Sequence, residues 1–145
     1  MSMFSLLKPL IVLASKGFRV VPTKPGVYVV FWIRGGNPVT IHRVLGVDKK
    51  GVLYIGSTRG KKGLRKRIND LWVSIEMVRG RRERKKFPHT FGRSLAYTGL
   101  YKVIKDDELW IYYKVFSGDE AEYQEKLALL EYTNKYLSLI HISEP

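Results

Sequence analysis

The chain carries few of the side chains that enzymes use for chemistry, and this narrows the reactions it can support. It has no cysteine, which excludes a thiol nucleophile, a disulfide framework and a cysteine-ligated zinc site. Its three histidines, His42, His89 and His141, lack the spacing of metal ligands. The sequence contains no GxxxxGK[ST] phosphate-binding loop and no dinucleotide fingerprint. Tyrosines, arginines and a few carboxylates remain.

These remaining side chains suit the hydrolysis of phosphodiester bonds. That reaction needs a base for the attacking water, a cation for the charge that develops on the phosphate, and a carboxylate to hold Mg²⁺. Two tyrosines stand in β-forming segments, Tyr28 in GVY and Tyr54 in YIG. The second segment, GVLYIGST at 51–58, runs directly into the basic stretch RGKKGLRKRI. Strand tyrosines also pack in cores, so the sequence leaves both roles open for each of them.

The charge of the chain is strongly positive and unevenly distributed. Its 145 residues include 26 Lys and Arg against 13 Asp and Glu, a formal net charge of +13. Residues 59–86 hold twelve basic and three acidic residues, so 12 − 3 = +9 lies in this stretch. Charge concentrated in this way attracts phosphates, whereas a scattered excess mainly aids solubility. Apart from Arg67, the basic residues that we expect to bind a nucleic-acid backbone are Arg59, Lys61, Lys62, Arg65, Lys66, Arg79, Arg81, Arg82, Arg84, Lys85 and Lys86.

Four segments have the composition of β-strands. GVYVVFWIR (26–34), VLYIGS (52–57) and ELWIYYKVF (108–116) are rich in the β-branched and aromatic residues that strands favour. VTIHRVLGV (39–47) follows a Gly-Gly-Asn-Pro turn and predicts a further strand. The two tyrosines of interest therefore belong to two different strands.

Three segments predict helices. The spacing of the first places on one buried face Leu64, Ile68, Leu71, Ile75 and Val78. The second helix lies within residues 90–104. It follows the stretch RGRRERKKFP (79–88), which is too charged for burial and predicts a loop or a solvated helix end. Ser117 and Glu120 have capping-box spacing for a last helix that ends near Tyr136. On the inner face of this last helix we expect Tyr123, Leu127, Leu130 and Asn134.

The order β-(β)-β-α-α-β-α predicts one α+β domain, and a hydrophobic content of 45% provides for its core. We assign residues 1–23 to an N-terminal arm or short helix and residues 24–136 to the domain. Residues 137–145, LSLIHISEP, form a tail that looks like translated adapter sequence. The apolar N-terminal segment is too short to span a bilayer, so we expect a cytoplasmic protein without a membrane partner.

Four motifs in this order resemble those of the GIY-YIG nuclease superfamily. GVY at 26–28 and YIG at 54–56 resemble the two halves of its signature. LRKRI, with Arg67, resembles the helix that carries the family's essential arginine. ALLEYTNKY, with Glu131, resembles the late helix whose glutamate binds the metal. His89, in FPHTFGR, resembles a histidine that some members carry after the arginine helix.

The resemblance implies a small central antiparallel sheet flanked by helices, and an endonuclease that cuts DNA, duplex or branched. It implies one Mg²⁺ or Mn²⁺ ion and no small-molecule cofactor. Tyr28 and Tyr54, alone or with His89, would activate the attacking water. Arg67 would stabilise the phosphate, and Glu131 would bind the metal. A homodimer, as in some restriction enzymes, would add the surface needed to read bases.

The chain also departs from the family pattern. Leu71 stands four residues after Arg67, where members often carry a His or Tyr that helps to activate water. That role would pass here to Tyr28, Tyr54 or His89, or be absent.

The spacing of the motifs raises a question of topology. Tyr28 and Tyr54 stand 26 positions apart, which implies an insert between the signature strands. A full strand at 39–47 in a simple meander would make those strands parallel, so the insert must pair elsewhere or bulge from the hairpin. Helical position leaves Arg65 and Arg67 equal, because both lie at edges of the apolar stripe, and only the resemblance favours Arg67.

Two other functions fit the same composition. A nucleic-acid-binding protein that keeps the fold but has lost catalysis would bind DNA or RNA and release no product. A basic RNA-binding accessory protein would prefer RNA to duplex DNA and would not need the tyrosines.

Overall fold

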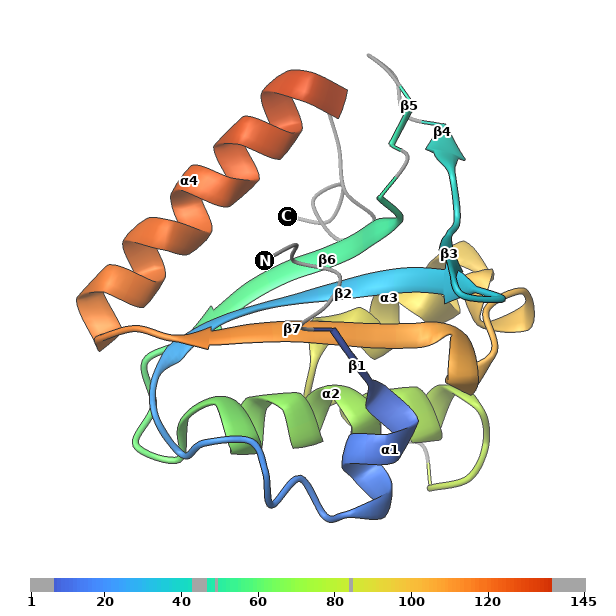
Figure 1. The fold of residues 1–145 in the computed structure, drawn as a ribbon. Helices are drawn as coiled ribbons and strands as arrows, with labels where there is room; N and C mark the ends of the chain where they lie inside the picture. The colour runs from blue at the N-terminus through green and yellow to red at the C-terminus, as the bar shows by residue number, and fades with distance from the viewer. Residues whose placement is uncertain (1–6, 43–46, 49, 84, 137–145) are drawn as a thin grey trace.

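A small antiparallel sheet forms the centre of the computed structural model (Figure 1). The structure describes residues 7–42, 47–48, 50–83 and 85–136, with the backbone alone described at 42, 47–48 and 132–136. The central strand, β2 (Gly26–Arg34), pairs on one edge with β6 (Val52–Thr58) and on the other with β7 (Leu109–Val115).

Two short strands extend this sheet. Strand β1 (Lys8–Pro9) pairs with β7, and β3 (Asn37–Pro38) pairs with the end of β2. All of these pairs are antiparallel, so the predicted α+β class with a small antiparallel sheet is confirmed.

The helices cover the two faces of the sheet unequally (Figure 1). One face is covered by α1 (Leu10–Ser15), α2 (Gly63–Val78) and α3 (Thr90–Thr98), and the other by α4 (Gly118–Tyr136) alone among the described elements. Two short 3₁₀ turns, η2 (Leu100–Lys102) and η3 (Asp106–Glu108), lead from α3 into β7.

Strand β2 is apolar on both sides because both of its faces are covered. Tyr28 and Val30 belong to the core beneath α1, α2 and α3, whereas Phe31 and Ile33 belong to the core beneath α4. Residues that alternate along a strand point to opposite faces, which explains why GVYVVFWIR is a continuous hydrophobic run.

The insert between β2 and β6 bulges from the hairpin that these strands form. It contains β4 (Ile41–His42) and β5 (Val47–Asp48), which pair only with each other among the described strands. The prediction of one strand over 39–47 is therefore wrong, and residues 43–46 lie outside the described part. The return is tight because Gly51 has a φ of +68°, and a Cβ there would lie 2.5 Å from the Trp32 carbonyl oxygen.

Helix α2 follows its sequence pattern closely. All five residues of the predicted stripe are buried. Its N-terminus is held by the preceding linker, since the amides of Leu64 and Arg65 donate to the carbonyls of Lys24 and Pro22 at 2.9 and 3.1 Å. These bonds satisfy amides that a helix start leaves unpaired, and they fix α2 beside the beginning of β2.

Helix α4 does not follow its pattern. The predicted inner residues Tyr123, Leu127 and Leu130 are 56%, 42% and 59% exposed, so that prediction is wrong. Ala121 is fully buried instead, and Leu129 packs on the apolar core beneath the helix. The side chain of Asn134, also expected inside, lies outside the described part.

The charged stretch after α2 is a loop, as predicted, although one of its arginines is buried. The side chain of Arg79 is 15% exposed and donates to the carbonyls of Tyr101 and Ile104 and to the carboxylate of Asp106. Charge alone suggested exposure, but five guanidinium donors can satisfy a ring of acceptors inside a protein.

No helix within residues 7–42, 47–48, 50–83 and 85–136 has both the length and the apolar character required to cross a membrane.

Candidate active site

The two candidate tyrosines, Tyr28 and Tyr54, lie side by side on one face of the sheet. Tyr28 is paired with Gly56, and Val30 is paired with Tyr54, so the tyrosines stand on neighbouring strands and face the same helices. Their ring centroids are 6.0 Å apart with 24° between the planes. A Cβ on Gly56 would lie 2.6 Å from the Tyr28 hydroxyl oxygen and 2.7 Å from Cε2 of Tyr54. The glycine after Tyr54 and Ile55 is therefore the residue that makes room for both rings.

His89 joins the tyrosines from a distant part of the chain. It is 1% exposed, and its Nε2 lies 2.7 Å from the Tyr28 hydroxyl oxygen. Its Nδ1 accepts the amide N–H of Phe91 at 3.0 Å and so caps the first turn of α3. Because Nδ1 accepts, it carries no proton, and the proton of the neutral ring is on Nε2. His89 therefore donates to Tyr28, which keeps its own hydroxyl proton for another acceptor.

The environment of Tyr28 favours its neutral form. Burial raises the pKa of its hydroxyl well above that of an exposed tyrosine, and the neighbouring Tyr54 adds to this increase. Arg67 acts in the opposite direction because its positive charge favours the phenolate, whereas the carboxylate of Glu125 raises the pKa again. All three of these groups are thus close enough to Tyr28 to act on its charge.

Arg67 is the partly open member of the cluster. Its side chain extends from α2 and is 32% exposed. Nη1 donates to the Pro88 carbonyl at 2.9 Å and lies 3.8 Å from Oδ2 of Asp70. Since Pro88 directly precedes His89, the same arginine that faces solvent also holds the backbone that places the histidine. Arg65 points elsewhere and donates to carbonyls of the N-terminal linker.

Tyr54 is held less tightly than Tyr28. Its hydroxyl lies 3.4 Å from Oγ1 of Thr90, and its ring meets those of His89 and Phe91 edge to face at 5.0 and 5.8 Å. Tyr54 is 8% exposed, whereas Tyr28 exposes none of its surface.

Among the described residues, the one carboxylate that acts on the charge of Tyr28 is Glu125, a residue that sequence reasoning missed, and it does so from α4 on the other face of the sheet. Its Oε1 accepts from the Ser57 hydroxyl at 2.5 Å, across the contact between α4 and β6. Glu131 is exposed, and it stands 131 − 125 = 6 positions further along α4. That separation corresponds to about 9 Å along the axis and about 120° around it. The sequence did contain a signal for Glu125. It is the acidic residue on a face of α4 that otherwise carries small residues, Ala121 and Ala128.

A divalent ion fits the donors near Glu125. The described residues contain no cluster of three or more His, Asp or Glu side chains that would enclose a metal. Mg²⁺ needs no such cluster, because it is commonly bound through one or two carboxylates together with water and substrate phosphate oxygens. Glu125 supplies one carboxylate at hydrogen-bond distance from the Ser57 hydroxyl, and both are hard oxygen donors.

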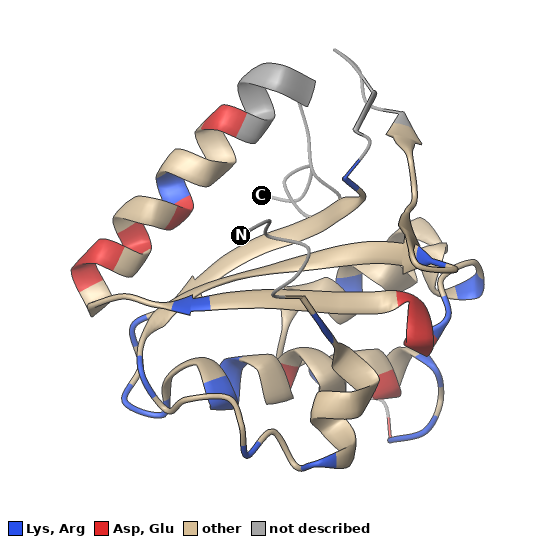
Figure 2. Cartoon of the chain, in the orientation of Figure 1, with Lys and Arg blue, Asp and Glu red and all other residues tan. Residues whose placement is uncertain are grey.

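The predicted nucleic-acid contacts fall into two groups at the two ends of α2 (Figure 2). In the group that follows the C-terminal end of α2, Arg79 and Arg81 both pair with Asp106, and Arg82 pairs with Glu76. Lys85 and Lys86 are exposed, and Arg84 lies outside the described residues.

In the group at the N-terminal end of α2, Arg59 pairs with Asp119 and Glu122 at the start of α4. Lys61 and Lys62 are exposed and have no carboxylate within ion-pair distance in the described part of the chain. Most of the arginines thus hold the fold together, whereas these two lysines point their charge outward.

Comparisons with protein-family models, with curated proteins and with solved structures found no match to this chain. Any functional conclusion therefore rests on the arrangement of the site.

Proposed function

We propose that the protein is a divalent-metal-dependent endonuclease of the GIY-YIG type that hydrolyses phosphodiester bonds of DNA. One observation carries this proposal: side chains from β2, β6, α2 and the start of α3 gather on one face of the sheet, and a glutamate of α4 acts on the charge of the same tyrosine from the other face. Together they supply two phenols, a histidine, a guanidinium and a carboxylate. The element order, with two antiparallel signature strands followed by the arginine helix, supports the same class.

The proposal places the metal on Glu125 in preference to Glu131. Glu125 acts on the charge of Tyr28, whereas Glu131 is exposed about 9 Å further along the same helix. When bound, a divalent ion would supply positive charge to the phosphate and its leaving oxygen. Glu125 would hold it, and Ser57 would orient the carboxylate through the 2.5 Å hydrogen bond.

The remaining groups have complementary roles. Arg67 presents a fixed positive charge to the phosphate and stabilises the additional negative charge of the transition state. Tyr28, as a neutral phenol, would orient the attacking water by a hydrogen bond, and His89 holds its hydroxyl in place by donating from Nε2. His89 is not the base, because its Nδ1 is occupied by the Phe91 amide and its Nε2 already carries a proton. Tyr54 packs against the rings of Tyr28 and His89.

The test uses two glutamates of one helix as a matched pair. Supercoiled plasmid is incubated with Mg²⁺ or Mn²⁺ and with wild-type protein, Glu125→Gln or Glu131→Gln. We expect nicking or linearisation that needs metal, falls about 10²–10³-fold in Glu125→Gln, and persists in Glu131→Gln. Loss in Glu131→Gln alone would return the metal to the residue that the sequence indicated.

Complete burial of Tyr28 favours a second candidate, a nucleic-acid-binding protein without catalysis. The burial of Leu71, where family members place a water-activating residue, points the same way. This candidate predicts tight binding, no product with any metal, and an affinity unchanged by Glu125→Gln. Duplex or branched DNA as the substrate, and a homodimer as the active form, stay predictions that rest on the resemblance.

A further inference from the structure

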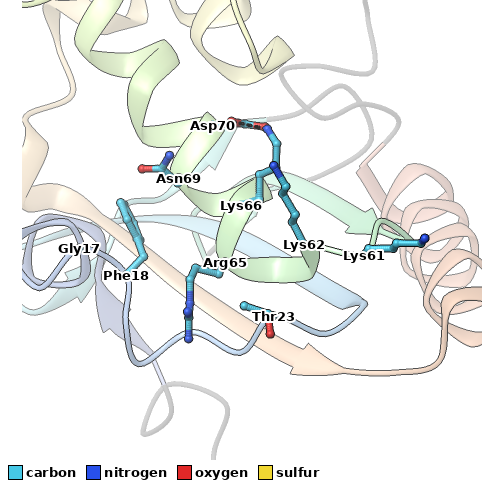
Figure 3. A pocket seen from close by; sticks show the side chains of 9 residues that line it. All are labelled: Gly17, Phe18, Thr23, Lys61, Lys62, Arg65, Lys66, Asn69 and Asp70. Atoms are coloured by element: carbon cyan, nitrogen blue, oxygen red, sulfur yellow. Dashed lines mark hydrogen bonds and ion pairs between the residues drawn. The ribbon is translucent and has the colours of Figure 1, made fainter.

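Two adjoining hollows lie at the N-terminal end of α2. The smaller, about 330 Å³, reaches Arg67 of the candidate active site and is lined by Thr58 at the end of β6. The larger, about 570 Å³, extends away from that site toward the linker at Phe18 and Thr23 (Figure 3). The two hollows share Lys61, Lys62, Lys66 and Asp70 as walls. They therefore lie side by side, with the arginine in the smaller hollow and the linker at the larger one.

The walls of the larger hollow are strongly cationic. Its lining holds Lys61, Lys62, Arg65 and Lys66 and a single carboxylate, that of Asp70, which gives 4 − 1 = +3. Figure 3 shows Lys66 and Asp70 together at one end, with Arg65 extending toward the opposite wall near Thr23.

The one carboxylate of the larger hollow is already engaged. Oδ2 of Asp70 lies 2.9 Å from Nζ of Lys66 and 3.8 Å from Nη1 of Arg67. The guanidinium of Arg65 donates to the carbonyls of Val21 and Arg19 at 2.8 and 3.0 Å, and neutral carbonyls leave its positive charge uncompensated. Within the described residues, Lys61 and Lys62 have no carboxylate partner either. The positive charge of this wall is therefore not balanced by carboxylates of the described residues, and an anion from outside the chain would balance it.

We propose that the larger hollow is a second phosphate-binding site, which holds a backbone phosphate of the same nucleic acid whose scissile phosphate lies at Arg67. The shared lysine wall is the reason, because a chain of phosphodiesters that leaves Arg67 toward the larger hollow meets Lys62 and Lys66 before it reaches Arg65. This inference rests on the proposed function in one respect, that the substrate is a nucleic acid. It adds the direction in which the backbone leaves the reaction centre.

Binding is measured without cleavage, by fluorescence anisotropy of a labelled DNA duplex in EDTA over a series of salt concentrations. The test variant is Lys61→Gln with Lys62→Gln, since both side chains are exposed and their loss leaves the core intact. The matched control is Lys102→Gln with Lys105→Gln, two exposed lysines beyond α3. We expect the slope of log K against log salt to flatten by about 0.9 for each lost contact, hence about 1.8 for the test pair. The control pair should keep the wild-type slope.

A length series separates a backbone site from a small-anion site. Affinity should rise as duplexes become long enough to reach both Arg67 and the second hollow, and the test pair should lose that rise. Equal slopes for the two pairs would overturn the proposal. So would inorganic phosphate or a mononucleotide competing as well as the long duplex, since the hollow would then bind free anions.

The two proposals fail in different ways. A flattened slope with no cleavage in any metal would remove the nuclease and keep the second phosphate site. Cleavage that depends on Glu125 but a wild-type slope in the test pair would keep the nuclease and remove the second site.

Discussion

Helices α2 and α4 both carry apolar residues at helical spacing, yet only α2 buries the face on which we expected them to pack. Leu64, Ile68, Leu71 and Ile75 of α2 have no exposed surface, whereas Leu127 and Leu130 of α4 are 42% and 59% exposed. Helix α2 lies between the sheet and two further helices, so apolar area decides its orientation.

Helix α4 covers its face of the sheet with a narrow strip of small residues. Ala121 and Ala128 let the helix approach β2 and β6, and Glu125 lies within the same strip. A helix that turns a carboxylate toward the protein leaves apolar residues outside. An apolar stripe therefore predicts the buried face of a helix when the burial of apolar area sets its orientation. Where the stripe is exposed instead, as in α4, a functional side chain on the buried face is a candidate reason.

The sharpest way to test this comparison is to truncate one leucine in each helix. Leu71→Ala removes a fully buried side chain of α2 and should lower the free energy of unfolding by about 2–5 kcal/mol. Leu130→Ala on α4 should change it by no more than about 0.5 kcal/mol, because the side chain is 59% exposed. Urea denaturation of the two variants gives both values. Similar losses would mean that the outer face of α4 is covered in solution.

Two glycines extend the comparison from the helices to the site. Gly56→Ala places a Cβ 2.6 Å from Tyr28 and should cost about 1–3 kcal/mol, because both tyrosine rings must move. Gly118→Ala, at the first residue of α4, meets its nearest atom at 3.7 Å and should be tolerated. Thermal unfolding measures the difference, and a tolerated Gly56→Ala would show that the rings are not closely packed.

The smallest effect is expected in the pH dependence of stability. Burial holds the pKa of Tyr28 above that of the unfolded chain, which is about 10. As pH rises past about 10, the unfolded chain loses this proton first, so the free energy of unfolding falls. The contribution is complete below that pH and is lost as the pH approaches the pKa of the folded state.

The variant Tyr28→Phe removes this titration. Its unfolding free energy should fall less steeply between about pH 9 and 11 than that of the wild type. Tyr123→Phe, on the exposed side of α4, is the control and should follow the wild type. An identical alkaline decline in all three proteins would show that Tyr28 keeps its proton equally in both states.

The sequence by itself determined most of the elements and the buried face of α2. Composition located β2, β6 and β7, apolar periodicity located α2, and capping-box spacing located α4. The family resemblance brought Tyr28, Tyr54, Arg67 and His89 forward as candidates, and the folded chain places all four together. Short elements such as β4 and β5 were missed because two residues carry no period.

Only the tertiary structure decided which charges hold the fold and which glutamate acts on the charge of Tyr28. Charge along the chain gave Arg79 and Lys62 the same weight, yet Arg79 binds two carbonyls and a carboxylate while Lys62 faces a hollow. Glu125 and Glu131 are equally acidic, and their helix pattern favoured the wrong inner face. The physical reason is that a charged side chain is positioned by its partners, and these are distant in sequence: Asp106 for Arg79 and Ser57 for Glu125. A local sequence pattern does not contain such partners.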